Sequence, residues 1–217
     1  MTSPSSANLE FVVRTIAQTA VDNERAFGEL DAVVGDGDFG YSLARGFEIV
    51  LADWDSFDRT EASGLLQKIA LTISKRVGGT SGPLWGTAFL RASAAVKGKT
   101  ELTGEDAVAM LRGAAEGIKK RGNSDVGDKT LLDALVPMTD AIAERLAADP
   151  ATPAPEVAKV AAGAARAAAD ATTSMQARRG RASYTGERSV GSPDAGAVAV
   201  AVMAERVAQT WPGSASS

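Results

Sequence analysis

The 217-residue sequence contains no cysteine and no histidine. Without cysteine, the chain has no disulfide framework, no thiolate zinc site and no cysteine nucleophile. Without histidine, it has no imidazole base, no His–metal ligation, no phosphohistidine and no Ser-His-Asp triad. A metal ion bound by this chain would therefore have oxygen ligands, which favours Mg²⁺ or Ca²⁺.

Aromatic residues and long apolar runs are also scarce. Only 5% of the residues are aromatic, and no stretch approaches the roughly 18 uninterrupted apolar residues of a membrane span. Residues 1–10 have no basic segment and carry Glu10 where the apolar part of a secretory signal would run. The net charge of −4 does not indicate nucleic-acid binding. We therefore expect a cytoplasmic protein with no membrane partner and no nucleic-acid partner.

The apolar residues mostly recur at spacings of three and four, which is typical of α-helices. Thr103 and Asp106 form the sequence pattern of a capping box, which predicts a helix start. The pattern predicts eight helices, near residues 9–20, 41–52, 65–73, 83–97, 103–118, 131–146, 157–173 and 197–207. The proline-rich stretch 149–155 is too closely flanked by helical patterns to be a domain linker. We therefore predict one all-α domain over residues 1–217, with frayed ends at 1–7 and 213–217.

A glycine-rich loop at residues 35–40 contains neighbouring carboxylates. Asp36 and Asp38 can face the same side of an extended loop, and Asp31 can fold back to them. Three carboxylates this close repel one another unless a cation holds them together, and Mg²⁺ prefers such oxygen ligands. The loop alone equally allows an Asx-turn, with aspartates that cap the next helix. Its glycine spacing also fits a dinucleotide-binding fingerprint, but no strand precedes it and the carboxylates would repel a pyrophosphate.

Two further loops have glycine backbone that could face an anion. Residues 77–83 lead into a helix with Ser81 as its predicted N-cap, where backbone N–H groups and the helix dipole favour negative charge. Residues 122–130 resemble a P-loop, but Asp128 is inserted before Lys129 and no strand precedes them, so we exclude a P-loop. Taken alone, residues 77–83 are better explained as a tight helix–helix turn, whereas residues 122–130 could cap the helix that begins near Asp128 and also lend glycine backbone to a ligand.

A basic segment follows the alanine-rich helix. Arg178, Arg179 and Arg181 precede another glycine-rich loop at 191–196. Arginine is well suited to phosphate oxygens, although a solvated basic helix end would also explain some of these side chains. Carboxylates for a metal, glycine backbone for an anion and arginine for phosphate are together the components of phosphoryl transfer, which needs no histidine.

In combination these motifs closely resemble the ADP-binding L subunit of dihydroxyacetone kinase, which also occurs as the C-terminal nucleotide domain of single-chain kinases. The resemblance covers nearly the whole chain. It rests on the segments 30–40, 78–84, 122–130 and 175–184. Phosphotransferase-system-linked L subunits usually have histidine where this chain has Phe39.

The resemblance implies an antiparallel eight-helix barrel that binds nucleotide in the loops at one end. It implies ADP or ATP and two Mg²⁺ ions as cofactors, with Asp31, Asp36 and Asp38 as metal ligands that act in catalysis together with Arg181. The implied nucleotide contacts are Phe39, Gly40, Tyr41, Ser42, Thr80, Ser81, Gly122, Leu131, Arg181 and Asp194.

The resemblance also implies a function and its partners. In the family, a K subunit or K domain holds dihydroxyacetone through a histidine, and these 217 residues contain neither. We therefore expect phosphoryl transfer from Mg²⁺-bound nucleotide to dihydroxyacetone, or a similar short-chain ketose, held on a K-type partner subunit. A phosphohistidine M subunit is a second partner in the phosphotransferase-linked version, and a homodimer is also compatible with the sequence. The nucleotide domain of a fatty-acid kinase and a nucleotide-loaded regulatory module remain as alternatives.

Overall fold

The computed structural model describes residues 4–79 and 81–212. These residues form α-helices and three short 3₁₀ helices without any β-strand, so the predicted all-α class is confirmed. No helix in the described part of the chain is long and apolar enough to cross a membrane. The elements are α1 (Pro4–Asp22), α2 (Glu24–Asp31), α3 (Phe39–Ala52), η1 (Trp54–Ser56), α4 (Ala62–Arg76), α5 (Ser81–Ala95), α6 (Gly104–Gly122), α7 (Leu132–Ala148), α8 (Ala154–Ala171), η2 (Thr172–Ser174), η3 (Arg181–Ser189) and α9 (Ala195–Thr210).

The predicted helix starts have clear physical causes. At the start of α6 the Thr103 hydroxyl accepts a hydrogen bond from the Asp106 N–H, and the Asp106 carboxylate accepts one from the Thr103 N–H, so the capping box is confirmed. At the start of α9 the Asp194 carboxylate accepts a hydrogen bond from the Ala197 N–H at 2.8 Å.

One detail of the sequence prediction, the number of helices, is wrong. The described residues contain nine α-helices rather than eight, because α2 was missed: it has only eight residues and a single buried one, Phe27, which gives periodicity little to detect. Of residues 1–7, where we expect a frayed end, the structure describes 4–7 as the first turn of α1, which begins at Pro4. The Ser5 hydroxyl accepts a hydrogen bond from the Leu102 N–H, which ties this first turn to the loop before α6. The predicted fraying at 213–217 lies outside the described residues.

Eight of the helices follow one another around a closed ring. Each of α1 and α3–α9 contacts the next, α9 contacts α1, and α2 packs on α3 and α9 outside this order. One buried cluster around Phe47 and Ile69 fills the side formed by α1, α3, α4 and α5, and a second around Leu132 fills the side formed by α6–α9. Alanines such as Ala165 on α8 let neighbouring helices approach closely. This core fixes the helix ends from which the loops project.

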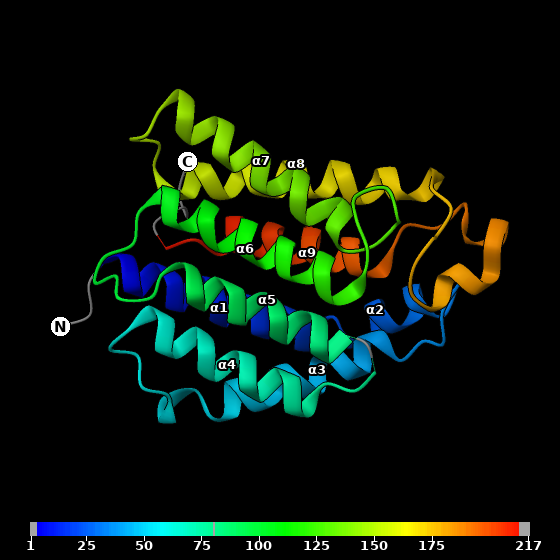
Figure 1. Ribbon diagram of the computed structural model, residues 1–217, viewed down its shortest axis with the longest axis horizontal. Helices are drawn as coiled ribbons and strands as arrows, with labels where there is room; N and C mark the ends of the chain where they lie inside the picture. The colour runs from blue at the N-terminus through cyan, green and yellow to red at the C-terminus, as the bar shows by residue number, and fades with distance from the viewer. Residues whose placement is uncertain (1–3, 80, 213–217) are drawn as a thin grey trace.

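The four loops singled out in the sequence lie at one end of the ring. Figure 1 shows α2, η3 and the loops that precede α3, α5, α7 and α9 together at the right, while α1 begins and α9 ends at the left. Antiparallel neighbours joined by short connections produce this arrangement, because every second connection returns to the same end. The site is therefore assembled from segments far apart in sequence.

Candidate functional site

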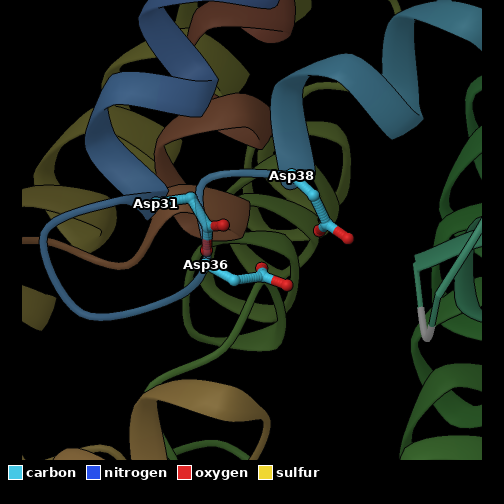
Figure 2. A group of neighbouring side chains, drawn as sticks. All are labelled: Asp31, Asp36 and Asp38. Atoms are coloured by element: carbon cyan, nitrogen blue, oxygen red, sulfur yellow. The ribbon is translucent and has the colours of Figure 1, made fainter.

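Three carboxylates meet at the start of α3. Asp31 is the last residue of α2, Asp36 lies in the loop, and Asp38 immediately precedes α3. One carboxylate oxygen from each lies within 4.8 Å of the others (Figure 2). The structure thus brings together the three aspartates selected from the sequence, with Asp31 folded back toward the loop.

Glycines give the loop this shape. Gly37 adopts φ +76°, in the left-handed region, and its N–H donates to the Asp31 carboxylate at 2.9 Å. A Cβ at Gly40 would overlap the carbonyl oxygen of Glu24, so glycine is needed where α3 begins against α2. The close approach of these two helices sets the spacing between Asp31 and Asp38.

The Asp38 carboxylate does not cap the helix that follows it. Asp38 occupies the N-cap position of α3 but makes no capping hydrogen bond with its side chain. The side chains of Asp36 and Asp38 are each about half exposed, at 46% and 47%. The alternative interpretation of the loop as an Asx cap therefore does not describe what Asp38 does, and its carboxylate remains available for a cation.

A cation from the fourth loop already lies against this cluster. The Arg181 guanidinium is 3.1 Å from a carboxylate oxygen of Asp38 and also contacts Asp36. Arg181 opens η3 directly after Gly180, which has φ +66°. The positive guanidinium relieves the repulsion that the clustered carboxylates would otherwise suffer.

The second loop borders the same cluster. A side chain at Gly79 would approach the Arg181 guanidinium, and one at Gly78 would approach the Ser42 hydroxyl. Gly79 has φ +63°, and α5 begins two residues later at Ser81. The N-terminus of α5 and the glycine backbone before it therefore face the carboxylate–arginine group, where an anion with bound cations would find both signs of charge.

The donor set fits Mg²⁺. The cluster offers carboxylate oxygens at one exposed edge and no nitrogen or sulfur ligand, which is the chemistry that a hard divalent cation prefers. Mg²⁺ commonly retains water and phosphate oxygens alongside one or two carboxylates, so the open side of the cluster suits it.

The remaining predicted contact residues occupy different environments. Phe39 is partly buried and its ring lies 6.1 Å from that of Phe27, so this side chain packs inward. Tyr41 is exposed, with the Arg45 guanidinium over its ring. Gly40 is buried at the α2–α3 contact. Thr80 lies outside the described residues.

A second group of predicted contacts lies on the third and fourth loops. Gly122 is the last residue of α6, and Leu131 is buried at the start of α7. Asp194 caps α9, and Gly196 packs against Leu131 there. Burial raises the pKa of Asp194 to about 7, and the nearby Asp133 carboxylate acts in the same direction.

Sequence reasoning missed the residue that joins these loops. The Lys129 side chain is buried and its ammonium donates to the backbone carbonyls of Met175 at 3.0 Å and Ser192 at 2.7 Å, and also to that of Ser189. Burial lowers the pKa of this ammonium. Lys129 therefore fastens both ends of the segment that carries Arg181. Its P-loop-like context was the only signal in the sequence, and that motif was rightly excluded.

The chain is similar to known proteins in sequence and in fold. The model of the DAK2 domain matches residues 33–209. The chain is 38% identical over 179 residues to the ADP-binding subunit of the PEP-dependent dihydroxyacetone kinase of Escherichia coli (strain K12). The aligned residues cover 82% of this chain and 84% of that subunit. It is 36% identical over 198 residues to L-erythrulose 1-kinase of Mycolicibacterium smegmatis. That alignment covers 90% of this chain but only 34% of the longer protein.

Solved structures show the same fold. The native dihydroxyacetone kinase of C. freundii superposes with a TM-score of 0.75 and 25% identity, covering 96% of this chain and 35% of that one. The complex of that kinase with AMP-PNP and Mg²⁺ superposes with a TM-score of 0.72. The matched region of these longer kinases is thus about a third of their length.

Proposed function

This chain belongs to the DAK2 domain family, and we propose that it is the nucleotide-binding subunit of a kinase that phosphorylates dihydroxyacetone or a similar short-chain ketose. The observation that carries this proposal is the group of three aspartate carboxylates within 4.8 Å of one another, with Arg181 against them and glycine loops beside them. Similar proteins that bind ADP, or AMP-PNP with Mg²⁺, support the choice of ligand.

The aspartates would hold the metal. Asp31, Asp36 and Asp38 have enough carboxylate oxygens to share two Mg²⁺ ions, which is the number that the family resemblance implies. Bound Mg²⁺ neutralises the charge on phosphate oxygens. The chain's own contribution is to fix the carboxylates, and the Gly37 N–H does this for Asp31.

The other loops would position the nucleotide. The glycine backbone at 78–79 and the N-terminus of α5 can donate N–H groups to phosphate oxygens, and Ser81 begins that helix. Arg181 can exchange its carboxylate partners for phosphate oxygens, because its guanidinium offers several donors in a planar fork. The backbone of Phe39–Ser42 at the start of α3, together with Thr80, Gly122, Leu131 and Asp194, completes the proposed nucleotide contacts.

A partner subunit would supply the sugar. These residues contain no histidine to capture a ketone, and the site lies at an exposed loop end where a second protein can approach. We therefore expect a K-type subunit to present the ketose. The phosphoryl donor would be ATP, or a phosphohistidine M subunit that recharges bound ADP.

Reconstitution tests the proposal. The purified chain with ATP, Mg²⁺ and dihydroxyacetone should not form the sugar phosphate, and addition of the cognate K-type subunit should start turnover, either directly with ATP or with a phosphohistidine donor. Native mass spectrometry of the purified chain should show bound ADP or ATP with Mg²⁺. Turnover by the chain alone would refute the partner requirement, and failure to bind any Mg²⁺-nucleotide would refute the nucleotide role.

A further inference from the structure

Positive charge is concentrated in one third of the chain. Residues 62–122, which comprise α4, α5 and α6 with their connections, contain ten Lys and Arg against four Asp and Glu, a net charge of +6. Because the whole chain has a net charge of −4, the remaining residues carry −10. The sequence average therefore conceals a basic face on an acidic protein.

The three basic helices lie side by side. α5 packs between α4 and α6, and all three are at the front of the view in Figure 1. Between them runs an open groove of about 760 Å³ on the outer surface. Its lining includes small residues from all three helices, among them Gly64 and Gly117. The hollow therefore arises where glycine and other small residues leave space between the helices.

The cations of this groove lack carboxylate partners. Arg91, Lys97, Lys120 and Arg121 line it together with a single carboxylate, that of Glu61. None of the four cations forms an ion pair with another residue that the structure describes, whereas the nearby Lys119 pairs with Asp125 at 2.8 Å. All four are exposed. Unpaired cations gathered around one hollow produce a focused positive potential.

Glycine in the middle of α6 allows this arrangement. A Cβ at Gly117 would come within 2.6 Å of the Arg91 side chain, so the arginine stem lies directly across the α6 backbone. Glycine inside a helix is unfavourable relative to alanine. The absence of a side chain at Gly117 leaves the groove open and gives the Arg91 side chain room to lie along it.

We propose that this groove, with its four cations, is the docking surface for an acidic face of the partner subunit that presents the sugar. The proposal rests on the function proposed above, which requires such a partner. The groove also contains the exposed side chain of Leu90, and arginine beside exposed apolar surface is typical of protein interfaces. A long nucleic acid would meet the −10 charge of the remaining surface, and a flat lipid surface does not fill a groove.

The basic face reaches the rim of the nucleotide site. Lys75 and Arg76 end α4 immediately before the second glycine loop, and Lys120 and Arg121 lie in the last turn of α6, before the third. The aspartate cluster at that end would repel an acidic partner. A partner attracted to the groove is therefore held beside the site mouth, which also fixes its orientation.

Charge reversal tests this docking surface. Arg91→Glu and Lys120→Glu should each weaken binding of the cognate sugar-loaded K-type subunit by about fivefold at 0.1 M salt, with a smaller difference at 0.5 M. Lys159→Glu on α8 makes the same charge change on an exposed residue outside the three basic helices and should leave the affinity unchanged. Calorimetry gives both affinities, and circular dichroism checks the fold.

Measurement of nucleotide binding distinguishes failure of the docking surface from failure of the proposed kinase function. All three variants should bind Mg²⁺-ADP as the unchanged protein does, because the substituted residues lie outside the carboxylate cluster. Equal affinity of the three variants for the K-type subunit would overturn the docking surface and leave the kinase proposal intact. The docking surface would also be overturned if Arg91→Glu and Lys120→Glu lost binding to single-stranded DNA or to anionic vesicles while their affinity for the K-type subunit stayed unchanged. Failure of the unchanged protein to bind Mg²⁺-ADP would instead refute the proposed function.

Discussion

The Arg181 guanidinium lies 3.1 Å from a carboxylate oxygen of Asp38 and also contacts Asp36, so an arginine occupies the side of the cluster where a metal-bound nucleotide is proposed to sit. A cation and an arginine cannot both neutralise the same carboxylate oxygens without competition. Arg181 is therefore proposed to have two roles, as a counter-charge before the ligand binds and as a phosphate contact afterwards.

Replacing either loop aspartate tests the metal site. Asp36→Asn and Asp38→Asn should each abolish Mg²⁺-dependent ADP binding, because each removes a charged oxygen ligand. Unfolding free energy should change by less than about 1 kcal/mol, since half-exposed ion pairs contribute little. Calorimetry with and without Mg²⁺, and thermal unfolding, measure these effects. Unaltered Mg²⁺-ADP affinity in either variant would show that the metal lies elsewhere.

Arg181→Ala should change metal and nucleotide affinities in opposite directions. Mg²⁺ alone should bind severalfold more tightly, because the competing guanidinium is gone. Mg²⁺-ADP should bind more weakly by roughly 1.5–3 kcal/mol, about one to two decades, because a charge-assisted hydrogen bond to phosphate is lost. Titrations of Mg²⁺ and of Mg²⁺-ADP into nucleotide-stripped protein measure the two affinities.

Two further variants control for charge and geometry. Arg181→Lys should recover only part of the nucleotide affinity, since lysine lacks the planar fork. Arg178→Ala removes the same charge from an exposed side chain three residues away and should leave both affinities nearly unchanged. Equal and negligible effects of Arg178→Ala and Arg181→Ala would assign the whole basic segment to a solvated helix end.

The sequence predicted the helices and the aspartate group for physical reasons. Helical periodicity records which faces are buried, and it identified the eight helices of the ring. Carboxylates spaced two apart between glycines have few arrangements, which brought Asp36 and Asp38 together. The inward packing of the Phe39 side chain could not be predicted from the sequence. It depends on Phe27 of α2, the helix whose apolar pattern was too short to detect.

Polar contacts between residues far apart in the chain also could not be predicted from the sequence. The acceptors of Lys129 are backbone carbonyls 46 to 63 residues away, and a backbone carbonyl has no signature in the sequence. The groove on α4–α6 has a similar origin, since it depends on which glycine faces which arginine across two helices. Such features follow from tertiary packing rather than from any local motif.

Removal of the buried ammonium should loosen the Arg181 segment. Lys129→Met leaves three carbonyl acceptors without their donor, and we expect an unfolding free energy lower by roughly 2–4 kcal/mol. Amide hydrogen exchange should accelerate across residues 175–192, and Mg²⁺-ADP affinity should fall because Arg181 is less well placed. Lys159→Met, an exposed control, should change neither. Unchanged exchange in the segment would show that Lys129 is not its anchor.

Stability should depend on the protonation of Asp194. The pKa of this carboxyl group is raised by burial to about 7, opposed by the Ala197 N–H and the Lys129 ammonium and reinforced by Asp133. Between the ordinary value near 4 and this raised value, the folded protein retains a proton that the unfolded chain has lost. The contribution to stability is therefore complete below about pH 4 and is lost as the pH rises toward 7.

Asp194→Asn isolates this contribution, because asparagine can still accept the Ala197 hydrogen bond and cap α9 but cannot ionise. The unfolding free energy of the unchanged protein should fall relative to that of the variant as the pH rises from 4 to 7. A shift of one pKa unit corresponds to about 1.4 kcal/mol, so even part of the effect is measurable by urea denaturation at each pH. Parallel pH profiles for the two proteins would mean that Asp194 ionises normally in the fold, and that its carboxylate is solvated rather than buried at the start of α9.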